Sequence, residues 1–580
     1  MNWGQWVRAH RRSLLFFLLA LVIAGSVTAF RLPVTLFPQV DFPRVEVTLD
    51  AGDRPAEQMA MQVTIPVEEM VRRVPGVLSV RSTTSRGTAE VSVNFPWGRD
   101  MTVATMQIDA AIAQILSTLP AGTTMLTRHM DPTVFPFMAY SLTSDRVPLT
   151  ALHDLAQYQL RPLLSGVEGV ARVQTVGGAQ EEYRVTLDPG RLQACGLTVA
   201  DVARILGAAN VISAIGRLED HYKLYLGISD TRLQTLTDLR QTVLLSSPGG
   251  VVRVGDVGVV SIGTTPQWIR VNADGREAVL LNVYQQPSGN SVQISRAIEQ
   301  RIRAFHLPPG VKLARWYDQS QLVLQAAASV RDAIFIGVAL AAGILLLFLR
   351  NLKVTIIALL VVPAVLATSM ILLRVLDMSF NIMTLGGIAA AVGLIIDDAI
   401  VMLEHIVRRL RSSHELTHER VMSAAREFAA PLVGSSAATM IIFIPLAFLD
   451  GVTGAFFKAL SLTMVICLFL SFLVTWLAVP LLADIFLGHR DAFQEEGGRL
   501  TRWVHDHYDA LMRGLFRHPS RVLLFILPLL GAGGLAWERL GSGFMPTMDE
   551  GGFVLDYRSP PGTSLTETDR LLRQVEAIIK

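Results

Sequence analysis

The sequence predicts an α-helical polytopic membrane protein with a large α+β domain between its first and second transmembrane helices. Three observations lead to this fold class. Of the 580 residues, 51% are hydrophobic and only 17% are charged, which is too apolar for a soluble chain of this length. Seven apolar stretches approach the ~20 residues that a helix needs to cross a bilayer. A long, mostly polar segment, residues 31–332, separates the first stretch from the others.

The seven predicted transmembrane helices are unevenly spaced. They cover residues 14–30, 333–349, 354–373, 381–405, 429–449, 459–486 and 521–537. The first stands alone, five follow one another closely, and a polar linker precedes the seventh. The remaining segments are the N-terminus (1–13), the large polar region (31–332), the linker (487–520) and the segment after the seventh helix (538–580), while helices two to six occupy 333–486.

The orientation follows from the short connections, because positively charged connections stay in the cytoplasm. Connections on one side of the predicted helices carry Arg8, Arg11, Arg12, Arg350, Lys353, Arg408, Arg409, Arg411, Arg420, Arg426, Arg490, Arg499, Arg502, Arg513, Arg517 and Arg521. The alternate connections, LDMSFN and LDGVTGAFFK, carry one lysine between them. Residues 1–13 and 487–520 are therefore predicted to be cytoplasmic, and residues 31–332 and the chain after Trp537 external.

The first apolar stretch has a second interpretation. A basic start, an apolar run and Val27-Thr28-Ala29 resemble a signal peptide with its cleavage site. Cleavage there would still leave six later transmembrane helices, so the membrane assignment holds under either interpretation.

The external region is predicted to contain two related α/β subdomains. Residues 88–95, TAEVSVNF, alternate polar and apolar side chains as a strand with one wet face does, whereas 101–118 and 290–305 have helical spacing. The sequence from Val74, VPGVLSVRSTTSRGTAEVSV, is echoed from Val167 by VEGVARVQTVGGAQEEYRV. Each copy predicts a helix end, a glycine turn and two strands. A smaller insertion is expected at about 180–265.

A second echo relates the two ends of the chain. LFPQVDFPRVEV, from Leu36 after the first helix, resembles FMPTMDEGGFVL, from Phe544 after the seventh. Transporters are often built from such duplicated halves, so the chain is interpreted as one half plus the start of a second. Between them, LTRWVHDHYDALMRGLF predicts an amphipathic helix that either lies along the inner membrane surface or serves as a soluble linker.

Two adjacent carboxylates, Asp397 and Asp398, lie inside the fourth apolar stretch. Each costs ~2.5 to 3.5 kcal/mol at a helix centre on insertion scales, so the pair needs a physical reason. Structural hydrogen bonding is one reason. Proton transport is the other, because two neighbouring carboxyls cannot both ionise easily in a low dielectric and titrate as a coupled pair. Ala389 and Gly393 precede Asp397 by eight and four residues, so its helix face is predicted to admit another helix closely.

These residues carry a family resemblance. The run GGIAAAVGLIIDDAIVMLEHIVRRL, with LPVTLFPQVDFPRVEV and GSGFMPTMDEGG, resembles the resistance-nodulation-division (RND) efflux transporters, inner-membrane pumps of Gram-negative bacteria. The resemblance implies that Asp397 and Asp398 are proton-relay carboxylates. It also implies a periplasmic porter domain of ferredoxin-like βαβ subdomains, with a docking insertion, that works as a homotrimer with a periplasmic adaptor and an outer-membrane channel.

The doubled aspartate resembles the hydrophobe and drug branch, because the heavy-metal branch usually has one aspartate there. The expected function is therefore proton-driven export of drugs or other hydrophobic or amphiphilic compounds by a multi-pass protein among membrane lipids. Heavy-metal cation efflux is the alternative.

The sequence departs from the family pattern in two ways. His405 stands where the family usually has asparagine, which is expected to alter only the cytoplasmic end of the helix. The second half, which in the family supplies a lysine counter-ion and much of the drug pocket, has no counterpart in these residues, so a truncated pump or a separate second polypeptide is expected.

A rival function comes from HELTH, residues 414–418, which fits the H-E-x-x-H pattern of zinc proteases. His414 and His418 would bind zinc and Glu415 would act as base. The surrounding RRLRSSHELTHERV is dense in charge, whereas a catalytic zinc helix needs an apolar shell, and Glu427 is only a guess for a third ligand. A solvated helix face is the simpler interpretation.

No cofactor, metal site or nucleic-acid partner is expected. The two cysteines, Cys195 and Cys467, are too few for a disulfide framework or a cysteine-based metal site. The glycine-bearing turns lack a phosphate-loop pattern, which disfavours ATP-driven transport. A formal charge of +2 gives no support to general nucleic-acid binding.

Overall fold

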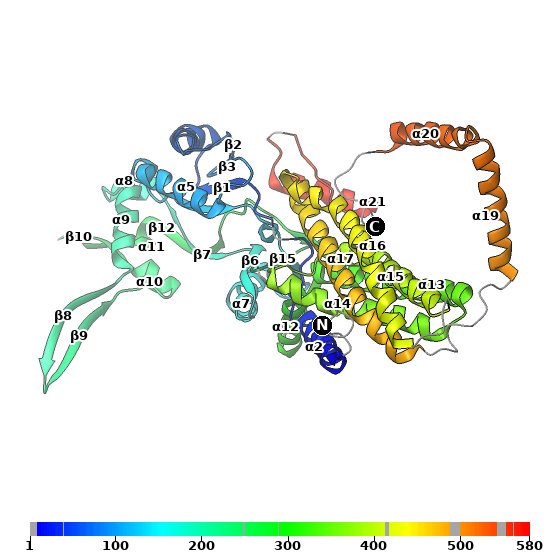
Figure 1. The fold of residues 1–580 in the computed structure, drawn as a ribbon. Coiled ribbons are helices and arrows are strands. Elements are labelled where there is room, and N and C mark those ends of the chain that lie inside the picture. The colour runs from blue at the N-terminus through cyan, green and yellow to red at the C-terminus, as the bar shows by residue number, and fades with distance from the viewer. Residues whose placement is uncertain are drawn as a thin grey trace.

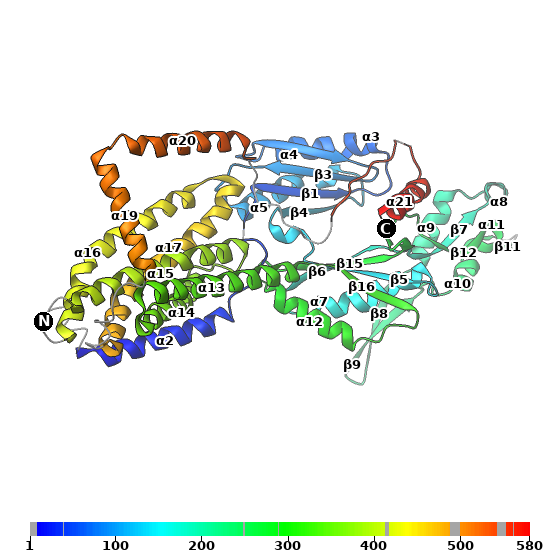
Figure 2. The same cartoon turned by 90° about the vertical axis from the view of Figure 1, so that its right-hand side faces the viewer.

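The computed structural model describes residues 9–38, 40–247, 250–287, 289–411, 417–487, 499–541, 553–560 and 562–579. Its two main parts are a bundle of long helices and an α/β region at one end of that bundle (Figures 1 and 2). The α/β region is built from two four-stranded sheets and several two-stranded ones. The fold therefore combines long apolar helices with mixed α/β content.

Seven described helices are long and apolar enough to cross a membrane. They are α2 (Arg11–Ala29), α13 (Gln319–Leu349), α14 (Leu352–Val375), α15 (Ile382–Arg411), α16 (Thr417–Phe443), α17 (Gly451–Phe486) and α20 (Arg521–Arg539). A short 3-10 turn, Ile444–Phe448, continues α16. Each of these helices overlaps one of the seven apolar stretches of the sequence.

Helix α17 is the packing centre of the bundle. It contacts α14, α15 and α16, and a single apolar core joins residues of all four helices. Helix α2 packs closely on α14 because Gly25 has no side chain: a Cβ there would lie 1.9 Å from the carbonyl oxygen of Ala367. Helix α20 and the preceding amphipathic helix α19 (Arg499–Arg517) are mostly exposed where they are described and lie apart from α14, α15 and α17 (Figure 1).

The first subdomain is a four-stranded sheet of order β2-β3-β1-β4. Its strands are β1 (Arg44–Asp50), β2 (Ser79–Thr84), β3 (Thr88–Asn94) and β4 (Thr124–His129), and its main helices are α3 (Ala56–Met59), α4 (Ile65–Val71) and α5 (Met101–Ile115). On β3, Ala89, Val91 and Val93 are buried while Thr88 and Glu90 are exposed. This is the alternation that the sequence predicts.

The second subdomain repeats this topology, with sheet order β16-β5-β15-β6. Its strands are β5 (Met138–Ser144), β6 (Val170–Gly177), β15 (Val279–Gln285) and β16 (Val311–Asp318), and its helices are α6 (Leu149–Asp154), α7 (Arg161–Ser165) and α12 (Ser291–Ala304). In both sheets the first strand lies between the third and the fourth. That order is characteristic of a ferredoxin-like split βαβ unit.

The insertion begins and ends with the antiparallel pair β7 (Glu181–Leu187) and β12 (Gly258–Thr264). Between them lie α8 (Pro189–Ala194), α9 (Val199–Ala209), β8 (Ile212–Asp220), β9 (Lys223–Asp230), α10 (Leu236–Gln241), β10 (Val243–Ser247), β11 (Gly250–Arg253) and α11 (Val254–Val257). The similarity between the segments from Val74 and from Val167 does not extend to strand pairing. In the first segment β2 pairs with β3, whereas in the second β7 pairs with β12 rather than with β6. Gly177 and Gly178 both have positive φ and turn the chain out of the second sheet.

Strands β8 and β9 form a two-stranded arm that extends from the insertion (Figures 1 and 2). We name residues 212–230 the β8–β9 arm. Its exposed apolar side chains are Ile212, Ile215, Leu218, Leu224, Tyr225, Leu226 and Ile228. An isolated two-stranded ribbon is at best marginally stable in water, and its exposed apolar side chains are unusual for a single chain. No local pattern in the sequence predicts this arm.

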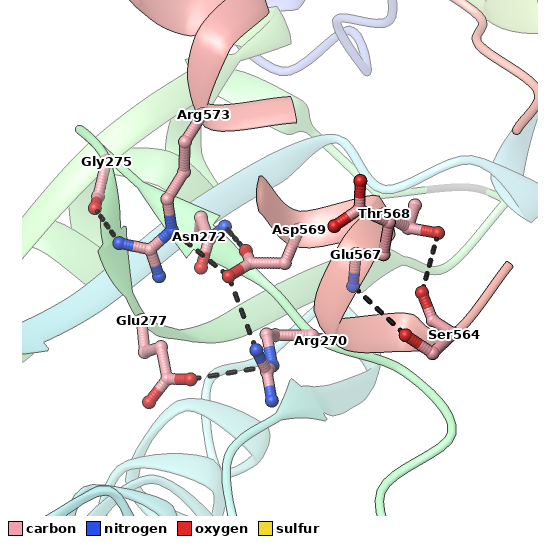
Figure 3. Close-up of polar contacts among 9 residues, drawn as sticks. All are labelled: Arg270, Asn272, Gly275, Glu277, Ser564, Glu567, Thr568, Asp569 and Arg573. Atoms are coloured by element: carbon pink, nitrogen blue, oxygen red, sulfur yellow. Dashed lines mark hydrogen bonds and ion pairs between the residues drawn. The ribbon is translucent and has the colours of Figure 1, made fainter. Parts of the chain in front are cut away.

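The last described helix, α21 (Leu565–Ile579), docks on a small hairpin of β13 (Asn272–Ala273) and β14 (Arg276–Glu277). Figure 3 shows the contact. The Asp569 carboxylate accepts hydrogen bonds from Arg270 Nη1 at 3.3 Å, from Arg573 Nε at 3.0 Å and from the Asn272 amide. Arg573 also donates to the carbonyl oxygen of Gly275 at 2.9 Å. Residues far apart in the chain are thus joined at one carboxylate.

Replacing Asp569 with alanine is expected to loosen α21 by several kcal/mol, because three hydrogen bonds to its carboxylate are lost and each contributes ~1.5 to 3 kcal/mol. Burial raises the pKa of Asp569, but the hydrogen bonds from Asn272 and Arg573 outweigh it and hold that pKa below its usual value. A lowered pKa in the folded state means that the contact stabilises at neutral pH and is lost as the pH falls below about 4.

Hydrogen exchange of the amides in residues 565–579 measures this contact. In Asp569→Ala, exchange of these amides should already be faster than in the wild type at pH 7. In the wild type, protection should be lost only in acid. Glu567→Gln is the matched control, because it removes an exposed pair with Arg570 on the same helix. Equal protection in Asp569→Ala and wild type would refute the assigned role.

Candidate functional site

Helix α15 carries the adjacent aspartates at the midpoint of its 30 residues. Its external end is fixed by the buried Asn381, whose side-chain oxygen accepts hydrogen bonds from the backbone N–H groups of Met383 and Thr384, both at 3.0 Å. This cap begins the helix on the side of the α/β region. Asp397 and Asp398 therefore lie deep between the two ends of the bundle.

Asp398 lies where three helices meet. Its carboxylate accepts hydrogen bonds from Ser436 Oγ on α16 and Ser471 Oγ on α17, each at 3.4 Å. Ser471 is fully buried and Ser436 nearly so. These are long hydrogen bonds, and a carboxylate can accept about four, so the two hydroxyls satisfy it only in part.

Asp397 has a different environment. It is turned ~100° around the helix from Asp398, and its side chain is exposed in the described chain. Gly393, one turn before it, is also exposed, and a Cβ added there would meet nothing within 4 Å. Ala389, a further turn away, is half-buried. The helix face beside Asp397, where the sequence predicts small residues, is therefore not covered by another described helix at Gly393 and Asp397.

This arrangement can accommodate either protonation state of Asp398. A serine hydroxyl can donate to a carboxylate or accept from a carboxylic acid by rotating about its C–O bond. Gain or loss of a proton would therefore change the hydrogen bonds that join α15 to α16 and α17. The site can couple protonation to small movements between these three helices.

Sequence reasoning missed Ser436 and Ser471. The available signal was weak: one serine in the run GSSAAT and one in LFLSF, each inside an otherwise apolar stretch. A hydroxyl in such a stretch most often bonds to its own helix backbone, as Ser369 does to Val365. Only the packing of the helices shows which serines reach the carboxylate.

His405 lies about two turns from Asp398, toward the cytoplasmic end of α15. Its ring stacks on Phe428 with centroids 5.4 Å apart. Its Nε2 lies 3.7 Å from the Glu427 carboxylate, too far for a hydrogen bond but close enough for electrostatic attraction. Arg409 binds the same carboxylate through Nε at 3.0 Å and Nη2 at 2.6 Å. The histidine therefore helps to join α15 to α16 away from the aspartates.

The zinc-protease motif cannot be located. His414 and Glu415 lie outside the described residues, and so does the side chain of His418. Glu427, the guessed third ligand, is occupied by Arg409. Within the described ranges, no group of three or more His, Cys, Asp or Glu side chains is placed to hold a metal ion.

The model of the AcrB/AcrD/AcrF family matches residues 8–580. The chain belongs to this family of RND permeases. Members are transporters rather than enzymes, which disfavours the protease interpretation. The described residues include seven helices long and apolar enough to cross a membrane, and the chain is a multi-pass protein of the inner membrane.

Two similar proteins are named as cation exporters. The chain is 28% identical to the cation efflux system protein CzcA of Alcaligenes sp. (strain CT14) over 571 residues, and equally so to the cobalt-zinc-cadmium resistance protein CzcA of Cupriavidus metallidurans. Each alignment covers 95% of this chain and 53% of the relative. The chain thus spans about half the length of the curated relatives it matches.

These relatives correct the expected substrate class. They do not support the drug branch or export of hydrophobic and amphiphilic compounds, and they favour the alternative, heavy-metal cation efflux. The doubled aspartate was a poor guide for a physical reason. Carboxylates in the middle of a membrane helix bear on proton coupling, whereas substrate choice depends on side chains that contact the substrate.

Proposed function

We propose that this RND permease chain forms part of a proton-driven efflux pump for divalent heavy-metal cations. The observation that carries the proton coupling is the contact of Asp398 with serines on two other helices, at 3.4 Å each. The cation substrate is supported by the names of the two relatives.

Protonation of Asp398 would supply the driving force. A unit charge moving across 100 mV gains ~2.3 kcal/mol, which is enough to bias a conformational equilibrium. Because Asp398 bonds to α16 and α17, the proton's arrival would alter how α15 packs between them. We propose that this local change is the step that the pump converts into export.

The chain offers a short mechanical path from these helices to the α/β region. Strand β16 ends at Asp318 and α13 begins at the next residue, with no linker between them. Asp318 caps that helix by accepting from the Ser320 N–H at 3.0 Å, and it accepts from Arg315 Nη1 at 2.8 Å. A shift of α13 would therefore move β16 and the second sheet with it. We propose that this sheet belongs to a periplasmic porter domain.

We propose that a further transmembrane helix packs against the open face of α15 and places a positively charged side chain beside Asp397. Asp397 and Gly393 lie on that face, and the small glycine permits close approach. The chain spans only about half the length of its relatives, so the remaining half of such a pump is the proposed source of the helix.

The proposed assembly is a homotrimer joined to a periplasmic adaptor and an outer-membrane channel, as RND permeases generally work with such partners. The β8–β9 arm supports self-association, because its apolar side chains are exposed on the single chain. A second copy of the chain is its proposed partner.

The substrate class can be tested in a bacterial host that lacks its own cation and drug exporters. The chain is expressed alone and together with a polypeptide that supplies the half of the relatives to which this chain does not align. Tolerance to zinc, cobalt and cadmium salts is expected to rise, with tolerance to a panel of hydrophobic drugs unchanged. Protection against drugs but not cations would reverse the substrate assignment. Protection against neither, in either arrangement, would refute an active pump.

A further inference from the structure

A basic cleft lies where the external ends of α2 and α14 meet helix α12. Its volume is about 700 Å³. The charged lining residues are Arg31, Arg301, Arg374 and Glu168. Arg31 lies two residues after the end of α2, Arg374 is in the last turn of α14, and Arg301 belongs to α12. The cleft is therefore shared between membrane helices and the α/β region.

Backbone hydrogen bonds fix the walls of this cleft. The N–H of Ser291, the first residue of α12, donates to the carbonyl oxygen of Val34 at 3.0 Å. The N–H of Phe380 donates to the carbonyl oxygen of Pro33 at 2.9 Å. The chain leaving α2 is thus held on one side by α12 and on the other by the segment after α14. The cleft is a built feature of the junction rather than a gap between independent parts.

The three arginine side chains differ in their hydrogen bonds. Arg301 donates to the carbonyl oxygens of Leu163 at 2.9 Å and Gly166 at 3.0 Å, so it is already occupied. Arg31 and Arg374 are exposed, and neither side chain has a hydrogen bond or ion pair within the part of the chain that the structure describes. With Glu168 as the one acidic lining residue, the cleft carries an excess of positive charge.

The depth of these arginines points to their ligand. Both stand at the external ends of helices that are long enough to cross a membrane, and phospholipid headgroups lie at the ends of such helices. Arginine at this side goes against the usual distribution of positive charge, which favours the cytoplasmic side. A guanidinium binds a phosphate through two parallel hydrogen bonds, and Val167, Ile294 and Ala297 add an apolar wall beside the charges.

We propose that this cleft binds the phosphate of an anionic phospholipid from the outer leaflet, with Arg31 and Arg374 as its ligands. The lipid joins α2 and α14 to the base of α12 and so stabilises the junction between the bundle and the α/β region. The excess positive charge selects phosphatidylglycerol or cardiolipin over zwitterionic phosphatidylethanolamine. This site is independent of which substrate the pump exports.

The test is native mass spectrometry of the purified full chain in detergent, titrated with phosphatidylglycerol, phosphatidylethanolamine or inorganic phosphate. The wild type is expected to bind phosphatidylglycerol about tenfold more tightly than phosphatidylethanolamine, and Arg31→Gln/Arg374→Gln is expected to lose that preference. Arg73→Gln/Arg81→Gln is the matched control, because it removes the same charge at exposed positions that do not line the cleft.

Three outcomes would overturn the proposal. Retention of the preference in Arg31→Gln/Arg374→Gln would exclude these arginines as ligands. Full displacement of the lipid by millimolar inorganic phosphate would show that the ligand is free phosphate and not a lipid. Loss of the preference in the control pair would show a diffuse charge effect. Arg31→Lys/Arg374→Lys checks folding, since it keeps both charges and should retain most of the preference.

Discussion

Asp398→Asn is expected to reduce efflux to the level of a host without the pump. Asparagine has nearly the same shape as aspartate and keeps an oxygen that accepts from Ser436 and Ser471, so packing is preserved. It cannot take up or release a proton at physiological pH, so coupling to the proton gradient is lost. The measurement is cation tolerance, together with proton flux in vesicles that contain the chain and a polypeptide supplying the other half of its relatives' length.

Ser436→Ala is the matched control for this prediction. It removes one hydrogen bond of 3.4 Å from the same carboxylate and leaves the carboxylate in place. A single such bond contributes ~0.5 to 1.5 kcal/mol net, so a reduction of efflux by several-fold at most is expected. Undiminished cation-dependent proton flux in Asp398→Asn would mean that the driving force enters elsewhere. A similar complete loss in Ser436→Ala would point to a packing role for the site.

Asp397→Asn separates the roles of the two carboxylates. The structure gives Asp398 partners on α16 and α17 and leaves Asp397 on the open face of α15. If the pair titrates as a unit, both variants lose transport. If only Asp398→Asn loses transport, the Asp397 carboxyl on the open face takes no part in proton transfer.

Ile215→Asp/Leu218→Asp in the β8–β9 arm is expected to convert the proposed assembly of several copies into single chains. Ile215 is 73% exposed and Leu218 is 66% exposed. Burying one such side chain contributes ~1.5 to 3 kcal/mol, and a charge in its place adds a desolvation penalty, so several kcal/mol are lost at each contact. Light scattering after gel filtration in detergent measures the mass of the assembly.

Val259→Asp provides the control for the arm, because Val259 is 66% exposed on β12 of the same insertion but lies outside the arm. It should leave the assembly intact. If the arm variant runs at the same mass as the wild type, the arm does not join copies of this chain, and its apolar face serves another partner.

The sequence alone predicted those features that are set by local physics. A helix must be long and apolar to cross a bilayer, so all seven spans could be placed, and each overlaps a helix of the structure. Period-two alternation predicted β3, whose buried and exposed residues alternate as expected. The motif around Asp397 and Asp398 predicted the family to which the chain belongs.

Other features depend on contacts between residues far apart in the chain. The pairing of β7 with β12, and the exposure of the β8–β9 arm, follow from which strands meet in space, and no local pattern contains that information. The drug branch was inferred from two adjacent residues, whereas relatives aligned over 571 residues favour cation efflux. Local motifs report the chemistry of a site better than the identity of its substrate.

The sequence by itself thus determined that two carboxylates lie inside the membrane on one helix, because the cost of burying charge makes such a pair conspicuous in an apolar run. Only the tertiary structure decided that they differ: Asp398 lies against Ser436 and Ser471, while Asp397 lies on an open face. The reason is geometric. Neighbouring residues on a helix point ~100° apart, so the packing of the surrounding helices, and not the sequence position, sets what each carboxylate meets.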